Sequence, residues 1–154
     1  MANEILVVDD NSDIRLLISS ILKDKGYIIR EAANFDQAVN EINKKMPDAA
    51  VIDVKLDKSD NDKDGIELLT RMKKIDEDVP VIMISGHANV QMAVDSLKLG
   101  AFEFMQKPFS TERLLNFVKR AVENIDLKKE KRVLENKLFH SYDIVGQSQA
   151  IEKV

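Results

Sequence analysis

The chain has 154 residues, of which 44% are hydrophobic and 32% are charged, with a net charge of −4 and a pI near 5.3. This length allows one core domain of ordinary size and some additional sequence. The acidic balance argues against nucleic acid or an anionic membrane surface as the main partner. The absence of cysteine excludes a disulfide framework and a thiolate metal site, and it fits a cytoplasmic protein.

The sequence shows neither a secretion signal nor a membrane span. The segment Met1–Leu6 lacks the basic region and long apolar stretch of a signal peptide. No apolar run approaches the roughly 18 residues that a bilayer-crossing helix needs. We therefore expect a soluble, cytoplasmic α/β protein with no membrane partner.

Short apolar runs alternate with helical patterns along most of the chain. The runs predict strands at 4–10 (where two carboxylates end the run), 27–29, 49–53, 81–84 and 101–105. Between them, apolar residues recur at helical spacing, and the helical segments end at Gly26, Pro47 and Gly100. The helical patterns comprise Ile14 to Leu22, Ala38 to Met46, Ile66 to Met72, Val90 to Leu97 and Leu114 to Ile125.

Five strand–helix cycles predict a doubly wound parallel sheet with helices on both faces. Right-handed crossovers favour the strand order 2-1-3-4-5. The second and fifth runs are less uniformly apolar than the others, as expected for the two edges of such a sheet.

The last helical pattern is longer than the sheet requires. Helix-favouring sequence continues through Lys128–Arg132 to Leu138, which gives roughly 40 Å of helix. A partial heptad is interrupted by Lys131, so residues 125–139 are interpreted either as a helix that joins a dimer or as a solvated linker. The pattern changes after Phe139, and we expect residues 140–154 to begin a further, truncated domain.

Chemically active side chains follow four of the predicted strands. Asp9 and Asp10 follow the first, Asp53 ends the third, Ser85 follows the fourth and Lys107 follows the fifth. The carboxyl ends of parallel strands meet at one edge, so these side chains should converge. Carboxylates packed together repel each other, and a hard cation such as Mg²⁺ relieves that repulsion.

A cation, an ammonium group and a hydroxyl around one carboxylate suit a phosphoryl group carried on that carboxylate, here Asp53. Each component also has an ordinary interpretation. The acid pair could cap a helix, Asp53 and Ser85 could be turn residues, and Lys107 could be a solvated side chain. Their occurrence together at four strand ends favours the phosphoryl site.

These motifs resemble the receiver domain of two-component response regulators. The resemblance covers about Glu4 to Asn124, so we expect a receiver domain over residues 1–124 with the flavodoxin-like or CheY-like fold of that family. The matching motifs are Val7–Asp10, Val51–Asp53, Ile84–Gly86 and Lys107–Phe109.

The resemblance implies a role for each site residue. Asp53 would accept a phosphoryl group from a phosphohistidine on a sensor histidine kinase. Asp10, Asp53 and the carbonyl of Lys55 would bind Mg²⁺ directly, and Asp9 would bind it through water. Lys107 would contact the phosphoryl oxygens. Ser85 would move to donate a hydrogen bond to them, and Phe104 would then turn inward.

Two further positions match sites that tune dephosphorylation in the family, Lys55 and His87. Their effect here cannot be inferred from the sequence, and His87 could equally be an exposed residue at the start of a helix. The chain would act as a phosphoacceptor with at most slow autodephosphorylation rather than as an enzyme.

Within this family, the chain resembles regulators of the NtrC and NtrX type. This resemblance rests on the segments Met83–His87 and Asp143–Ser148 and on the long last helix. In such proteins an AAA+ ATPase that acts on sigma-54 polymerase and a DNA-binding domain follow the receiver. Only the start of the ATPase would be present here, at residues 140–154. No G-x-x-x-x-G-K motif occurs, so we expect this chain neither to hydrolyse ATP nor to bind DNA.

The acidic segment Asp57–Asp64 departs from the family pattern, because it lengthens the loop after Asp53 by roughly four residues. Asp60–Gly65 matches the opening of an EF-hand loop, but Arg71 stands where the loop needs a bidentate glutamate. We therefore interpret the segment as a flexible insertion that shapes partner choice.

Two alternative functions are open. A phosphatase that works through an aspartyl-phosphate needs a second acid two residues after the nucleophile, where this chain has Lys55. A degenerate receiver that serves only as a dimerisation or interaction module is disfavoured by the intact set of site residues. Failure to bind a phosphoryl mimic would support this second alternative.

Overall fold

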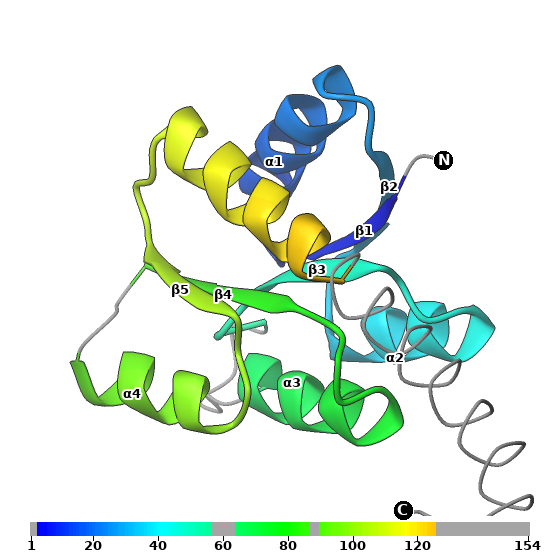
Figure 1. Cartoon of the computed structure of the whole chain (residues 1–154), viewed down its shortest axis with the longest axis vertical. Coiled ribbons are helices and arrows are strands. Elements are labelled where there is room, and N and C mark those ends of the chain that lie inside the picture. The colour runs from blue at the N-terminus through cyan, green and yellow to red at the C-terminus, as the bar shows by residue number, and fades with distance from the viewer. Residues whose placement is uncertain (1–2, 57–63, 87–89, 126–154) are drawn as a thin grey trace, which may run out of the picture.

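The computed structural model describes residues 3–56, 64–86 and 90–125. Strands and helices alternate strictly along this part of the chain (Figure 1). The described part closes with a further helix at residues 111–125. The other elements are β1 (Glu4–Val8), α1 (Ser12–Asp24), β2 (Ile28–Ala32), α2 (Phe35–Lys44), β3 (Ala49–Asp53), α3 (Asp64–Ile75), β4 (Val81–Ser85), α4 (Val90–Lys98) and β5 (Glu103–Gln106).

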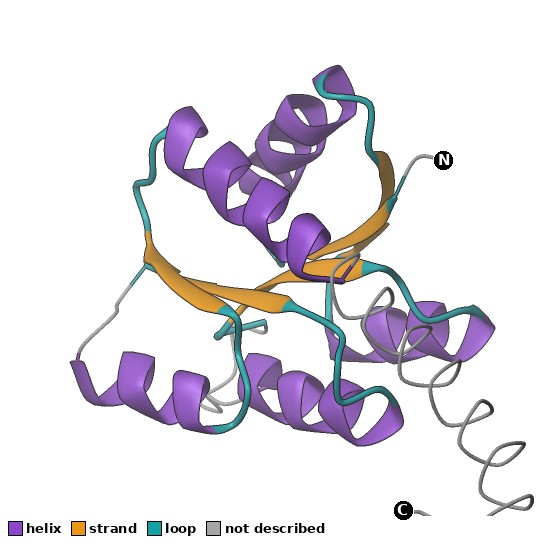
Figure 2. Cartoon of the chain, viewed as in Figure 1, coloured by secondary structure: helices purple, strands orange, loops and turns teal. Residues whose placement is uncertain are grey.

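The five strands form one parallel sheet in the order β2-β1-β3-β4-β5, as the sequence predicts. The sheet lies between two layers of helices (Figure 2). One face carries α1 and the helix of residues 111–125, and the other carries α2, α3 and α4 (Figure 1). This is the doubly wound arrangement expected from the alternation of elements.

Alternate residues of the central strands enter two separate cores. In β1, Leu6 and Val8 pack toward α2 and α3, whereas Ile5 and Val7 pack toward α1 and the helix of residues 111–125. Both faces of a central parallel strand are therefore buried, which explains why β1, β3 and β4 are nearly continuous apolar runs in the sequence. The edge strands β2 and β5 are only partly buried.

The edge strands differ most from the sequence prediction. β2 extends to Ala32 and includes Arg30 and Glu31. An edge strand can keep such polar side chains near water, so the apolar pattern in the sequence did not show the full length of this strand. β5 begins at Glu103 rather than Ala101. The two residues before it are used differently: the Ala101 N–H donates to the Ser96 carbonyl and closes α4, and the Phe102 N–H donates to the Val81 carbonyl.

The helix ends follow the sequence signals. The side-chain oxygens of Asn11 and Asn34 accept hydrogen bonds from the first turns of α1 and α2. Gly26 and Gly100 have φ angles of 92° and 105°, the left-handed conformation that ends a helix at little cost only for glycine. The expected projecting helix at 125–139 and the expected new domain at 140–154 lie outside the described residues. In the part of the chain that is described, no helix is long and apolar enough to cross a membrane.

Two leucines of α1 provide a matched test of this core. Leu22 is fully buried, whereas Leu16 is 57% exposed. We expect Leu22→Ala to lower the free energy of unfolding by about 2–5 kcal/mol, because it leaves a cavity between α1 and the sheet. Leu16→Ala should change it by no more than about 0.5 kcal/mol. Urea unfolding followed by circular dichroism measures both, and equal losses would contradict the assignment of Leu22 to the core.

Candidate functional site

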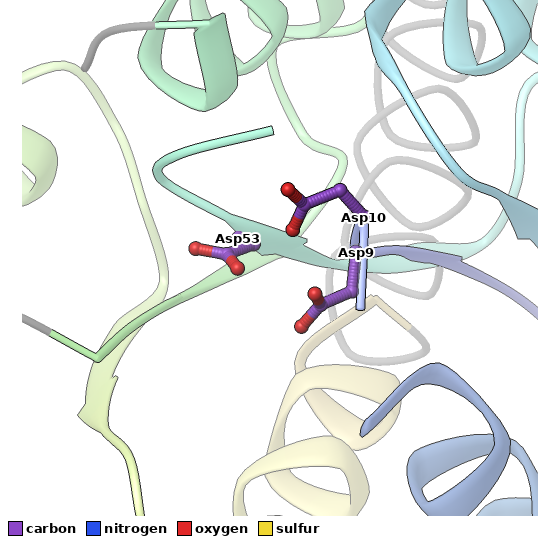
Figure 3. Close-up of side chains that lie close together, drawn as sticks. All are labelled: Asp9, Asp10 and Asp53. Carbon is purple, nitrogen blue, oxygen red and sulfur yellow. The ribbon is translucent and has the colours of Figure 1, made fainter. Parts of the chain in front are cut away.

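The carboxyl edge of the sheet brings together the side chains that the sequence places at four strand ends. Asp9 directly follows β1, Asp53 and Ser85 end β3 and β4, and Lys107 directly follows β5. Figure 3 shows Asp9, Asp10 and Asp53 close together at this edge. Carboxylate oxygens from these three residues lie within 4.8 Å of one another. The predicted convergence is therefore present in the fold.

Lys107 joins two of the carboxylates. Its Nζ lies 2.8 Å from Asp53 Oδ2 and 3.0 Å from Asp9 Oδ2. Asp9 is fully buried and Asp53 is 5% exposed, so both charges are largely removed from water. A buried charge is tolerated only when it is paired, and this single ammonium group serves both carboxylates.

Main-chain donors fix the other oxygens of these two carboxylates. The Asn11 N–H donates to Asp9 Oδ1 at 2.9 Å, and the Lys55 N–H donates to Asp53 Oδ1 at 3.1 Å. Each donor lies two residues beyond its acceptor, so the turn that leaves each strand also orients the side chain at the strand end. Asp9 and Asp53 are thus held from two sides.

Burial dominates the electrostatics of the site. It raises the pKa of Asp53 to about 6, and neighbouring Asp9 adds to that rise, while the hydrogen bond from Lys107 opposes it. Burial and Asp9 also raise the pKa of Asp10. Burial alone would lower the pKa of Lys107, but its hydrogen bonds to Asp53 and Asp9 hold that pKa above its ordinary value.

The residues present fit a hard divalent cation. The cluster offers only oxygen ligands, which Mg²⁺ prefers. Asp9 Oδ2 is buried, and its contact within the described residues is with the ammonium group of Lys107. Three carboxylates beside one ammonium group leave excess negative charge, which a cation would neutralise.

Ser85 and Phe104 are the two residues that the resemblance predicts to move. Ser85 is 4% exposed and is the last residue of β4, whose neighbouring strand β3 ends at Asp53. Phe104 is partly buried and packs against the core on the α3 side of the sheet, as does Met92 of α4. The roles of Ser85 and Phe104 as the moving residues stay predictions.

The sequence analysis assigned no role to Gly65, whose backbone approaches Asp53 closely. A Cβ atom at this position would lie 2.1 Å from the Asp53 carbonyl oxygen, closer than any side chain permits. The Gly65 N–H donates to the Val54 carbonyl at 2.9 Å and ties the start of α3 to the end of β3. In the sequence, the glycine that follows the acidic segment is the feature that could have indicated this close approach.

Arg15 was also overlooked. Its Nη1 donates to the main-chain oxygen of Asp9 at 2.8 Å, and its Nε donates to Glu31 at 3.2 Å. Nothing in the sequence indicated this role, because a contact to a main-chain carbonyl leaves no pattern there.

Other motifs lie apart from the cluster or outside the described residues. His87 and residues 57–63 of the acidic loop fall outside them. Arg71, which occupies the glutamate position of the EF-hand pattern, places its guanidinium 5.5 Å from the centre of the Phe35 ring. It therefore contributes to the contact between α2 and α3.

The raised pKa of Asp53 predicts how stability depends on pH. The pKa of an aspartate in the unfolded chain is about 3.9. Between this value and the folded-state pKa of about 6, the folded protein binds more protons than the unfolded chain. The free energy of unfolding therefore falls as the pH rises through this window. We expect Asp53→Asn to raise the melting temperature of the metal-free protein by about 4 °C or more near pH 7.5, but not near pH 4. Thermal unfolding measures this difference, with the exposed Asp24→Asn as control; equal melting temperatures at both pH values would contradict it.

Comparison with known proteins gives the family of the chain. Residues 5–119 match the response regulator receiver domain. The nitrogen assimilation regulatory protein NtrX of Azorhizobium caulinodans is 41% identical over 154 residues, which cover 100% of this chain and 33% of that protein. The chain thus spans about a third of the length of the curated relatives of this type.

Solved structures agree. The crystal structure of the receiver domain of NtrX from Brucella abortus is 43% identical, with a TM-score of 0.71, and the match covers 77% of this chain and 98% of that one. The solution structure of the beryllofluoride-activated NtrC4 receiver domain dimer is 37% identical, with a TM-score of 0.73 and coverage of 79% and 98%. With the strand order and the acidic cluster, these matches show that the chain belongs to the response regulator receiver domain family, among relatives of the NtrX and NtrC type.

Proposed function

We propose that Asp53 accepts a phosphoryl group from a phosphohistidine on a sensor histidine kinase and that the resulting acyl phosphate switches the conformation of the domain. One observation carries this proposal: the ammonium group of Lys107 lies 2.8 Å from the Asp53 carboxylate, with the two acidic residues of the β1–α1 turn beside it. Such a group can neutralise charge on phosphoryl oxygens.

The transfer requires the ionised form of Asp53, because its carboxylate is the nucleophile. One carboxylate oxygen forms a bond to phosphorus while the phosphorus–nitrogen bond of the phosphohistidine breaks, and the imidazole nitrogen keeps that electron pair. Lys107 then contacts the transferred group, and the Lys55 N–H continues to orient the carboxylate. Although burial raises the pKa of Asp53 to about 6, this value is still below neutral pH, so the reactive anion predominates there.

The metal ligands come from the same cluster. Asp10, Asp53 and the main-chain carbonyl of Lys55 would hold Mg²⁺ directly, and Asp9 would hold it through a water molecule. When bound, the ion supplies positive charge that offsets repulsion between the carboxylates and the incoming phosphoryl oxygens.

The switch uses Ser85 and Phe104. The Ser85 hydroxyl would move toward the phosphoryl group, and Phe104 would turn inward into the space released. The neighbouring helix α4 buries only Ser96 among its nine residues, so few contacts resist its displacement. Phosphorylation is thereby coupled to the surface of α4.

That surface suits a second copy of the chain. Val90, Leu97 and Leu99 are 81%, 48% and 43% exposed, an apolar group around α4. The related NtrC4 receiver was solved as a beryllofluoride-activated dimer. Phosphorylation would promote a homodimer through this surface, and a helix at 125–139 would support it.

The longer protein would use this switch to control transcription in the cytoplasm. The proposed arrangement is a receiver at 1–124, a helical linker at 125–139 and the start of an AAA+ domain at 140–154. The AAA+ domain would act on sigma-54 polymerase, and a later domain would bind DNA. This chain itself lacks the ATPase motifs and would act as a phosphoacceptor, not as an enzyme.

Phosphoryl uptake tests the proposal. With acetyl phosphate and Mg²⁺, the wild-type chain should gain one phosphoryl group by intact-mass spectrometry. Asp53→Asn should reduce uptake by at least about tenfold because it removes the nucleophile, while Asp24→Asn on α1 should not change it. Undiminished uptake in Asp53→Asn would contradict the assignment. A wild-type chain that binds no beryllofluoride would favour the degenerate interaction module instead.

Oligomeric state tests the role of α4. Light scattering should show a dimer when beryllofluoride is added. A charge at the centre of an apolar interface is costly, so Leu97→Asp should keep the chain monomeric, whereas Leu16→Asp on α1, at a comparably exposed leucine, should dimerise normally. A Leu97→Asp variant that dimerises as the wild type does would exclude this surface. Truncation after Asn124 then measures the contribution of the later residues.

A further inference from the structure

Arg15 connects the acidic turn after β1 to the neighbouring strand β2. It lies one turn into α1, and its side chain is 19% exposed. Nη1 donates to the Asp9 carbonyl oxygen at 2.8 Å, and Nε donates to Glu31 Oε1 at 3.2 Å. The planar guanidinium group therefore holds two acceptors, one in the turn after β1 and one in β2, in one fixed geometry.

The Asp9 carbonyl belongs to the peptide unit that leads into Asp10. Because a peptide unit is planar, holding its oxygen also fixes the direction in which the chain continues to the Asp10 Cα. The contact thus acts on Asp10, although Arg15 bonds only to Asp9 and Glu31. It determines the point from which the Asp10 side chain extends.

Asp10 is the carboxylate of the cluster that most needs this restraint. Asp9 and Asp53 each receive a main-chain N–H and the ammonium group of Lys107. Asp10 is exposed, its side-chain partner in the cluster is the like-charged Asp9, and within the described residues its carboxylate makes no ion pair. Repulsion from Asp9 favours turning it toward water, away from Asp53.

We propose that Arg15 is a positioning residue for the cation site: it holds the Asp9–Asp10 peptide so that the Asp10 carboxylate faces Asp53. The role is geometric, since the cation that stabilises the charge of Asp10 is Lys107. This inference rests on the proposed function, in which Asp10 and Asp53 bind Mg²⁺. Groups that orient metal ligands typically contribute about 10–100-fold to metal affinity.

Mg²⁺ titration followed by ¹H–¹⁵N NMR tests the inference without any phosphoryl donor. Arg15→Ala and Arg15→Lys should each weaken the Kd for Mg²⁺ by about tenfold, because neither can hold both acceptors. Glu31→Gln, which keeps an oxygen acceptor for Nε, should stay near the wild-type affinity. Arg113→Ala, which removes an exposed arginine elsewhere, is the control for lost positive charge.

A second measurement separates positioning from damage to the fold. In the metal-free protein, Arg15→Lys should shift the backbone amide signals of Asp10 and Asn11 while the melting temperature stays close to that of the wild type. This variant keeps the test decisive if Arg15→Ala does not fold. Wild-type Mg²⁺ affinity in Arg15→Lys would overturn the inference, because charge alone would then suffice.

The two proposals fail in different ways. If the wild-type chain binds Mg²⁺ and Arg15→Ala and Arg15→Lys bind it equally well, only the role of Arg15 is overturned. If the wild-type chain binds no Mg²⁺ at all, the proposed function is overturned, and this inference with it.

Discussion

The contact of Lys107 with Asp53 and Asp9 is the interaction on which the site depends. Two buried carboxylates beside a third would be strongly unfavourable without this ammonium group, and the same group is suited to contact a phosphoryl group. Because Lys107 directly follows β5, at the edge of the sheet, its reach to Asp9 requires the strands between them to keep their register. The contacts that Lys107 makes in the site therefore depend on the order of the strands in the sheet.

The site is built from short turns on a rigid sheet. Asn11 and Lys55 each donate a main-chain N–H to the carboxylate two residues before them, and Gly65 brings the start of α3 against Asp53. Apart from Ser85 at the end of β4, the parts that are proposed to change position lie where packing is lighter, along β5 and α4. A stiff acidic site next to a loosely packed helix is consistent with the phosphorylation switch that we propose.

Much of this architecture could be predicted because central parallel strands are buried on both faces and so appear as apolar runs. Asp9, Asp10, Asp53 and Ser85 could be picked out because each ends or follows such a run, and Lys107 because it follows the shorter, partly apolar run of β5. Arg30 and Glu31 hid the extent of β2, since an edge strand does not need an apolar sequence. Arg15 acts through a carbonyl oxygen and Gly65 through the absence of a side chain, so neither leaves a periodic signal.

The hydrogen bond from Gly65 to Val54 bears on the length of the loop that follows Asp53. It closes this loop at a fixed point, so residues can be added between the two ends without moving Asp53. Closing a longer loop costs only about 0.6 kcal/mol for each doubling of its length. The acidic segment of this chain thus lies where added length costs little stability and leaves the position of the Asp53 carboxylate unchanged.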